Sequence, residues 1–327
     1  MIIKPLEEPV KIQKLEVLKK RLFPTHVKLK EIEKELAKTT AGYKGEKSLL
    51  YYLSFLPEEE YMILHDLRLT IDNRNYFQID ILILSQYFIL ILEVKNISGK
   101  ITFDETYHQL IRQFNDVEEV FPDPVLQVNH QKYQLIRYLN KKKIVSLPIE
   151  TQVVMTNNSA LLRNQNNSRK YLDTIMRSSE LITKVEYYKQ KYKAPIFTIK
   201  DLRKVAKSLL KGHIPSEFNI FHLFELNSND ICKGVFCTNC GCYPLQRVRG
   251  TWYCGECNFS SRNAHLETFN DYKLLFGTTI TNKQTRDFLQ ISSPSTTYKI
   301  LASMKLPQIG HGKSTSYYLL GSVKLCC

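Results

Sequence analysis

Two long apolar runs constrain the fold of this chain more than any other feature. They span residues 79–84 and 87–94, and only Ser85 and Gln86 separate them. Apolar runs joined by a short polar break are typical of adjacent antiparallel strands. Alternation places Ile79, Ile81 and Ile83 on one face of the sheet and the intervening leucines on the other. Both faces are therefore predicted to be buried, which in most proteins means that helices cover them, and the expected fold class is α/β.

Three charged residues interrupt these strands: Asp80, Glu93 and Lys95. A two-residue turn at Ser85–Gln86 places Asp80 opposite Ile91, and alternation then sets all three charges on one face. Asp80 and Glu93 become diagonal neighbours about 7 Å apart. Charges buried in strands are costly unless they are paired or bind a ligand. Two carboxylates at this reach can hold one hard divalent cation, with Lys95 beside it. The alternative is a buried ion pair at a strand end.

These residues belong to a series of four short motifs. In chain order they are Gly42-Tyr43-Lys44-Gly45-Glu46, Gln78-Ile79-Asp80, Glu93-Val94-Lys95-Asn96 with Gly99, and Pro124-Val125-Leu126-Gln127. The series resembles the nuclease-related domain (NERD) family of the PD-(D/E)XK nuclease superfamily, closely over residues 41–139 and at most over the first 210. Ile79 stands where the superfamily pattern has proline.

This resemblance implies a restriction-endonuclease-like core, with a mixed sheet flanked by helices, and metal-dependent hydrolysis of DNA. Asp80, Glu93 and Glu46 would hold Mg²⁺ or Mn²⁺, Lys95 would align or deprotonate the attacking water, and Gln127 would orient the region around Lys95. The implied catalytic set is Glu46, Asp80, Glu93, Lys95 and Gln127.

The residues themselves leave other interpretations open. Glu46 lies early in a predicted helix, on the same stripe as Leu49, Leu50 and Leu53, where the helix dipole alone would favour a carboxylate. Asp123 and Pro124 form an N-cap and N1 pair that begins a helix through Leu139. On that helix Gln127 could simply be solvated, and His130 is interpreted as structural or solvent-facing rather than catalytic.

Six of the eight cysteines fall between residues 232 and 257. Cys237-x-x-Cys240 and Cys254-x-x-Cys257 are separated by 13 residues that read as a short hairpin. Two thiolate pairs supply the four ligands of a structural Zn²⁺ site, so a zinc ribbon is predicted over residues 231–260. A cluster of reduced cysteines, or a redox pair, is the alternative. The roles of Cys232, Cys242, Cys326 and Cys327 stay open.

The remaining chain, residues 261–327, is predicted to be mainly helical. A first helix over 266–276 ends at Gly277, and a second opens at Thr281 with a capping box. A third runs from Ser293 to Met304, with Tyr298, Leu301 and Ala302 inward, and a hairpin follows. This order resembles a winged helix-turn-helix, which implies DNA contacts from the outward residues Thr296, Thr297 and Lys299 and from Lys313 on the wing. A helical packing or dimerisation module is the alternative.

Charge favours a nucleic-acid partner. The 327 residues carry a net charge of +14, and residues 231–327 hold eleven Lys and Arg against four Asp and Glu. Such an excess indicates a polyanion, with DNA preferred and RNA open. No apolar run reaches 18 residues and no signal peptide is visible, so a cytoplasmic protein without a membrane partner is expected. The oligomeric state stays open.

The predicted organisation has five parts. They are a basic helical segment at 1–40 that packs on the nuclease-like domain or along nucleic acid, the NERD domain at 41–210, a linker at 211–230, the zinc ribbon at 231–260 and the DNA-binding module at 261–327. Two rivals to the metal-dependent DNA nuclease are kept: a DNA-binding regulator with an idle nuclease fold, and an RNA-directed nuclease.

Overall fold

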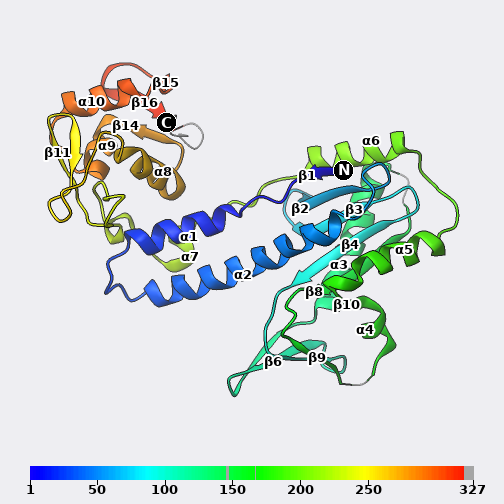
Figure 1. Cartoon of the computed structure of the whole chain (residues 1–327). Coiled ribbons are helices and arrows are strands. Elements are labelled where there is room, and N and C mark those ends of the chain that lie inside the picture. The colour runs from blue at the N-terminus through cyan, green and yellow to red at the C-terminus, as the bar shows by residue number, and fades with distance from the viewer. Residues whose placement is uncertain (145–146, 166, 320–327) are drawn as a thin grey trace. The chain divides into compact units, whose positions relative to one another are not determined.

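The chain divides into two compact units. Unit 1 comprises residues 1–8 and 39–217, and unit 2 comprises residues 9–38 and 218–327. The computed structural model describes residues 1–144, 147–165 and 167–319, apart from the side chain of Lys313. Cys326 and Cys327 lie outside the described residues. Figure 1 shows the course of the chain through both units.

A six-stranded mixed sheet forms the centre of unit 1. Its strand order is β1 (Ile2–Lys4), β2 (Met62–Thr70), β3 (Tyr76–Leu84), β4 (Ile89–Lys95), β8 (Ile149–Met155) and β10 (Ile175–Arg177). The β2–β3 and β3–β4 pairs are antiparallel, whereas β4 and β8 are parallel. The mixed α/β architecture predicted from the apolar runs is thus confirmed.

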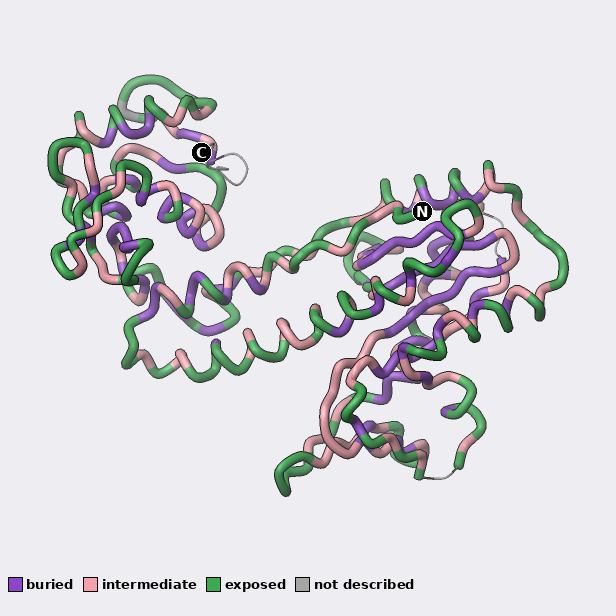
Figure 2. The backbone as a smooth tube through the Cα atoms, viewed as in Figure 1, coloured by how far each residue is buried: buried purple, intermediate pink, exposed green. Residues whose placement is uncertain are grey.

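Helices cover both faces of this sheet. They are α2 (Leu29–Leu53), α3 (Pro124–Lys141), α4 (Arg169–Thr174), α5 (Leu181–Lys191) and α6 (Ile199–Gly212). The apolar sides of α3 and α6 pack on one face, and those of α2 and α5 pack on the other. Strands β3 and β4 are buried along most of their length (Figure 2). Removing so much apolar surface from water is the main force that holds the layers together.

A second sheet of unit 1 was not anticipated from the sequence. It has four strands in the order β7 (Val117–Pro122), β6 (Gln109–Phe114), β5 (Lys100–Asp104) and β9 (Leu161–Asn164). The last of these strands, β9, lies in an Asn-rich part of the chain and pairs in parallel with β5. Only this pairing distinguishes a four-residue strand from a loop, because the segment has little apolar periodicity.

The apolar alternation of β3 breaks at Asp80. Phe77 and Ile79 pack in the same cluster as Leu82, while Ile81 packs in the cluster on the opposite face. The prediction that Ile79 shares a face with Ile81 is therefore wrong. The neighbouring strand β2 has Asp66 in a left-handed conformation, with φ of 46°. A local irregularity of this kind changes the direction in which the side chains of a strand point. Here it lies at Asp66 of β2.

Unit 2 contains residues 9–38, which are most of the basic N-terminal segment. Its elements are α1 (Val10–Arg21), α7 (Ile220–Phe224), β11 (Gln246–Val248), β12 (Thr251–Tyr253), β13 (Ser260–Ser261), α8 (His265–Phe276), β14 (Thr279–Thr281), α9 (Asn282–Leu289), α10 (Pro294–Ser303), β15 (Gln308–Ile309) and β16 (Ser316–Tyr318). Arg21 of α1 is fully buried, pairs with Asp271 of α8 at 2.7 Å and donates to the Cys232 carbonyl at 3.0 Å. Helix α1 thereby belongs to the core of unit 2.

His65 of β2 supplies a pH test of unit 1. It is fully buried, and neither ring nitrogen has a hydrogen-bond partner among the described residues. Burial, assisted by the charge of Lys4, lowers its pKa from 6.5 to about 4. In this pH range the unfolded chain binds a proton at His65 and the folded unit does not, so the contribution of His65 to stability falls as the pH drops from 6.5 to about 4. For His65 alone we expect a loss of about 3 kcal/mol.

Hydrogen exchange of the β2 and β3 amides at several pH values measures this loss. His65→Phe should gain stability relative to the wild-type chain as the pH drops through this range, whereas His130→Gln, which alters an exposed histidine, should follow the wild-type chain. An unaltered pH slope in His65→Phe would contradict the assignment to His65.

Candidate active site and metal centre

Gly45 sets how closely helix α2 approaches the central sheet. A Cβ at this position would lie 2.6 Å from Asn96 Cβ and 2.9 Å from Thr156 Oγ1. Asn96 Nδ2 also donates to the Ala41 carbonyl at 2.8 Å, which ties the helix to the residue after β4. Only glycine permits this approach, because any side chain would push the helix away. The contact holds the next residue, Glu46, at the carboxyl ends of β4 and β8.

Glu46 lies well inside α2 and not in its first turns. The helix begins at Leu29, so the predicted helix start near Gly42 is wrong. The basic N-terminal segment supplies the preceding turns and makes one continuous helix. Because the influence of a helix dipole is confined to the terminal turn, it does not explain the position of Glu46.

The β3–β4 register brings Asp80 close to Glu93. Ile81 pairs with Leu92 and Leu84 pairs with Ile89, so Asp80 comes opposite Glu93 when the register is continued by one residue. The predicted pairing of Asp80 with Ile91 is wrong. The turn has four residues, 85–88, closed by hydrogen bonds from the Ser85 N–H and hydroxyl to the Phe88 carbonyl. The Ser85 side chain thus stabilises a longer turn than the sequence suggested.

Asp80 and Glu93 are held by different partners. Asp80 Oδ2 accepts the Val94 N–H at 2.8 Å. Glu93 is 2% exposed; its Oε1 accepts from Lys95 Nζ at 2.6 Å and its Oε2 from Gln131 Nε2 at 2.6 Å. Lys95 Nζ also donates to Gln127 Oε1 at 3.0 Å. Lys95 therefore lies between Glu93 and helix α3.

Helix α3 begins where its predicted cap places it. Asp123 accepts the Val125 N–H at 2.8 Å, Pro124 occupies the first helical position, and Tyr171 donates to the Asp123 carboxylate at 2.7 Å. This cap orients the face of α3 that carries Gln127 and Gln131. Gln131 was not selected from the sequence. Its spacing of four residues from Gln127 was the available signal, since residues at i and i+4 share a helix face.

The three carboxylates are electrostatically coupled. Burial and the charges of Glu93 and Glu46 raise the pKa of Asp80 well above its usual range, against the Val94 hydrogen bond and Lys95. Burial and the charges of Asp66 and Glu93 raise the pKa of Glu46 to about 7. The ammonium groups of Lys95 and Lys4 do not offset this much negative charge. The region is an acidic, partly buried site that a cation would stabilise.

The chemistry of this donor set fits a hard divalent cation. All three side chains offer oxygen, the ligand that Mg²⁺ and Mn²⁺ prefer. The oxygens of the three carboxylates are nevertheless too far apart to form one cluster. Among the described residues, only four cysteines form a group of three or more metal-ligating atoms within 4.8 Å of one another. Both oxygens of Glu93 are taken by Lys95 and Gln131. Each of these oxygens keeps a second lone pair, so Glu93 can still bind an ion, but the three side chains would have to converge on it.

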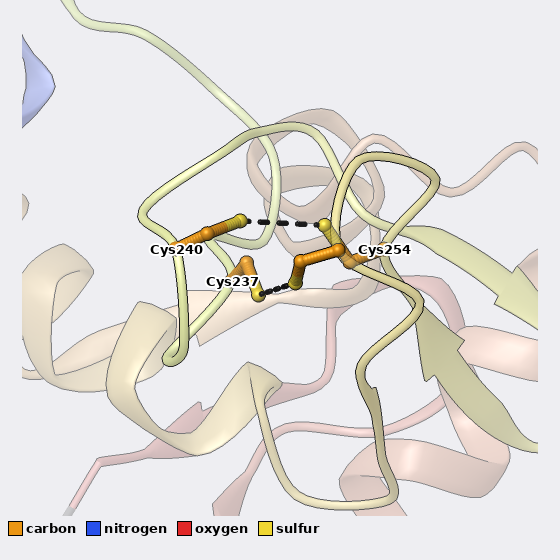
Figure 3. Close-up of side chains that lie close together, drawn as sticks. Cys237, Cys240 and Cys254 are labelled. Carbon is orange, nitrogen blue, oxygen red and sulfur yellow. Dashed lines mark hydrogen bonds between the residues drawn. The ribbon is translucent and has the colours of Figure 1, made fainter.

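The four-cysteine cluster lies in unit 2, beside the small antiparallel sheet β11–β12–β13. Cys237 Sγ is 3.6 Å from Cys257 Sγ, and Cys240 Sγ is 3.6 Å from Cys254 Sγ (Figure 3). Zn–S bonds of about 2.3 Å in a tetrahedron give S–S separations of about 3.8 Å. The sulfur geometry is thus consistent with Zn²⁺ and supports the predicted ligand set. Cys232, by contrast, accepts from the Tyr243 hydroxyl at 2.9 Å, and Cys242 lies outside the four-sulfur group.

Zinc is expected to hold this part of unit 2 together. Cys254→Ser should lose the ion and destabilise unit 2 by several kcal/mol or more, because the binding energy of a structural zinc is also folding energy. Zinc content measures the first effect. Emission of Trp252, which is 1% exposed and two residues from Cys254, reports the second. Cys242→Ser is the matched control, and equal zinc loss in both variants would contradict the ligand assignment.

The C-terminal helices follow their predicted caps. Thr281 and Gln284 form the capping box of α9, and α8 ends at Gly277. The three short strands pair in the order β14-β16-β15. On α10, however, Thr297 is fully buried and donates its hydroxyl to the Ser293 carbonyl at 3.1 Å, so its predicted outward orientation is wrong.

The inner face of α10 is Thr297, Ile300 and Leu301, not Tyr298, Leu301 and Ala302. Tyr298 is 59% exposed, Lys299 is exposed and Thr296 is partly exposed. The Lys313 side chain lies outside the described part of the chain. No helix within the described ranges is both long and apolar enough to cross a membrane.

Comparison with known proteins supports an assignment for part of the chain. A family model described as "Nuclease-related domain" matches residues 41–156. No curated protein and no solved structure matches the chain significantly. The matched range contains Gly45, the acidic β3–β4 pair, Lys95 and the start of α3. Residues 41–156 therefore form a nuclease-related domain of the NERD family.

Proposed function

We propose that unit 1 is a metal-dependent nuclease that hydrolyses phosphodiester bonds in DNA. One observation carries the proposal: the ammonium group of Lys95 is held by Glu93 and Gln127 beside three coupled carboxylates. Acidic residues with an adjacent cation are the arrangement that a phosphodiester reaction needs, because negative charge increases at the phosphorus centre as the reaction proceeds.

Asp80, Glu93 and Glu46 would hold Mg²⁺ or Mn²⁺. When bound, such an ion supplies positive charge that polarises the phosphoryl oxygens and favours deprotonation of the attacking water. The protein's own part is to keep the three side chains close at the edge of the sheet. Gly45 does this for Glu46, the Val94 N–H for Asp80 and Gln131 for Glu93.

Lys95 would act on the substrate directly. An ammonium group has three N–H donors, and Glu93 and Gln127 use two of them. The third is available for a phosphoryl oxygen or for the attacking water. Gln127 would fix the direction of this donor, since its amide oxygen accepts from Nζ at 3.0 Å.

Unit 2 would supply DNA affinity. The basic excess of residues 231–327 favours phosphate contacts that do not depend on sequence. The helix, strand, two helices and two strands from α8 to β16 have the order of a winged helix-turn-helix. In that arrangement the exposed side of α10, with Tyr298, Lys299 and the partly exposed Thr296, would face the duplex, and Lys313 would lie on the wing.

A cleavage assay on the whole chain tests the function. Duplex DNA, single-stranded DNA and RNA are incubated with Mg²⁺, with Mn²⁺ or after metal removal from the buffer. We expect metal-dependent DNA cleavage, lowered by about 10³-fold in Asp80→Asn. The matched control is Asp116→Asn in the β6–β7 turn, where asparagine tolerates the φ of 59°.

Each other outcome selects a rival. Binding of DNA without cleavage in any metal indicates a regulator with an idle nuclease fold. Cleavage of RNA alone indicates that the protein is an RNA-directed nuclease. Equal cleavage by Asp80→Asn and the wild-type chain rules out the proposed site.

A further inference from the structure

A cavity of about 360 Å³ lies within unit 2, and its lining includes neither the four clustered cysteines nor Tyr298 and Lys299 of α10. Arg247 of β11, Arg262 and Asn263 line it, together with His265 of α8 and Ser303 of α10. Apolar side chains of α8 and α10 complete the wall. Among the described lining residues every charged side chain is an arginine, and no carboxylate faces the cavity.

Arg247 is the unusual member of this group. Its guanidinium lies over the ring of Trp252, with Cζ 4.9 Å from the ring centroid. Nη1 is buried and has no hydrogen-bond partner within the described part of the chain. A buried charged donor without an acceptor is costly, and native proteins rarely keep one without a reason. The aromatic contact offsets part of the charge but does not supply an acceptor.

Neighbouring groups do not supply that acceptor. His265 Nδ1 already accepts from Trp252 Nε1 at 3.0 Å. Burial and the charge of Arg247 lower the pKa of His265 to about 4, so this ring is neutral at physiological pH. Arg262 is exposed and forms no ion pair among the residues that the structure describes. Two guanidinium groups therefore face one cavity, and none of the described residues that line it supplies a compensating anion.

We propose that this cavity binds a phosphate group between Arg247 and Arg262. Guanidinium groups bind phosphate oxygens through paired N–H donors, and such charge-assisted bonds are among the strongest in proteins. Asn263 and Ser303 add uncharged donors. The volume is within the range of small-molecule sites, large enough for a phosphate with part of its attached group. The phosphate belongs either to a nucleic-acid strand or to a free phosphorylated molecule. The site is distinct from the proposed nuclease centre and does not depend on cleavage by unit 1.

Trp252 is the only tryptophan of the chain and lies under the Arg247 guanidinium, so in the zinc-loaded chain a change in its fluorescence on titration reports on the surroundings of Arg247. The whole zinc-loaded chain is titrated in magnesium-free buffer, in one arm with inorganic phosphate and in the other with a short duplex oligonucleotide. We expect saturable changes in emission. Arg247→Gln should raise the Kd by about tenfold or more, and Arg262→Gln by about three- to tenfold.

Arg249→Gln is the matched control. Arg249 lies in the same hairpin as Arg247, is exposed and does not line the cavity, so its Kd for phosphate should stay within about twofold of the wild-type value. Zinc content and the thermal unfolding transition establish that Arg247→Gln is folded. Arg262→Gln changes an exposed side chain and keeps the test valid if Arg247→Gln does not fold.

Saturation by inorganic phosphate, weakened in both variants, supports the site with a free phosphorylated ligand. Saturation by the oligonucleotide alone, weakened in the same variants, supports it with a strand phosphate as ligand. Affinities for both probes that are unchanged in Arg247→Gln and Arg262→Gln overturn the proposal. The titration contains no magnesium and measures binding in unit 2. Its outcome therefore does not depend on whether unit 1 cleaves DNA.

Discussion

Replacement of Lys95 by methionine is expected to lower the rate of metal-dependent DNA cleavage by about 10²–10³-fold. Methionine keeps the length of the side chain and removes the ammonium group that lies between Glu93 and Gln127. The transition state then loses a positive donor at the point where charge develops. The readout is single-turnover cleavage at saturating protein, so that substrate binding does not limit the rate.

The same change has a second, measurable consequence. Glu93 is 2% exposed and loses its ammonium partner, and breaking a buried pair costs about 3–5 kcal/mol. The variant also lacks the Lys95 ammonium group, which competes with a divalent ion for the carboxylate oxygens. Added Mg²⁺ should therefore stabilise Lys95→Met more than the wild-type chain, as followed by hydrogen exchange of the β4 amides. A structural ion pair without a metal site would show no such difference.

Lys100→Met is the matched control for this prediction. Lys100 of β5 also lies on a strand and donates to a glutamine, Gln113 Oε1, at 3.2 Å, but it belongs to the other sheet of unit 1. It should cleave DNA within about twofold of the wild-type rate, as expected for a change away from the site. Gln127→Leu should show an intermediate loss of about tenfold, because it removes only the group that orients Nζ. A Lys95→Met enzyme as active as Lys100→Met would exclude a catalytic role for the lysine.

A second large effect is expected from two glycines in one helix. Gly45→Ala places a Cβ 2.6 Å from Asn96 Cβ, so α2 must move away from the ends of β4 and β8. We expect a loss of about 1–3 kcal/mol in stability and, because Glu46 moves with the helix, a loss of cleavage of about 10²-fold. Gly42→Ala meets nothing within 4 Å and should stabilise the helix by about 0.5–1 kcal/mol.

The comparison of Gly42→Ala with Gly45→Ala separates the effect of helix propensity from the effect of moving α2 relative to the sheet. Both add one methyl group to the same helix, three residues apart, so any shared effect on the unfolded chain cancels. Thermal unfolding and single-turnover cleavage are measured for each. If Gly45→Ala cleaves as fast as Gly42→Ala, the seating of α2 does not control the site.

Local chemistry made much of the fold predictable. The Asp123–Pro124 pair begins α3, the Thr281–Gln284 box begins α9, and Gly277 follows α8. In each case the determining hydrogen bond or backbone angle lies within four residues, so sequence spacing contains the whole signal. The two CxxC pairs were predictable for the same reason, because this spacing brings two sulfur atoms together wherever the segment lies in the fold. The apolar runs of β3 and β4 likewise predicted a sheet covered on both faces.

Other features were not evident from sequence spacing, and most of them depend on contacts between distant segments. The loop of four residues in the β3–β4 hairpin follows from the Ser85 hydroxyl bond to Phe88, and it moves Asp80 from Ile91 to Glu93. Strand β9 exists because β5 lies beside it. The orientation of Thr297 depends on which side of α10 meets the core of unit 2, and a short amphipathic helix with several threonines does not determine this by periodicity.

The sequence alone determined which chemical groups the nuclease-related domain contains and on which kinds of element they lie. Only the tertiary structure decided that Gln131 holds Glu93 and that Gly45 seats Glu46 against the sheet. It also decided that Nη1 of Arg247 is buried at a cavity without a hydrogen-bond partner among the described residues. The reason is physical: caps, turns and ligand pairs form through interactions of short range along the chain. Burial and electrostatic coupling arise from packing, and packing joins residues that sequence spacing does not relate.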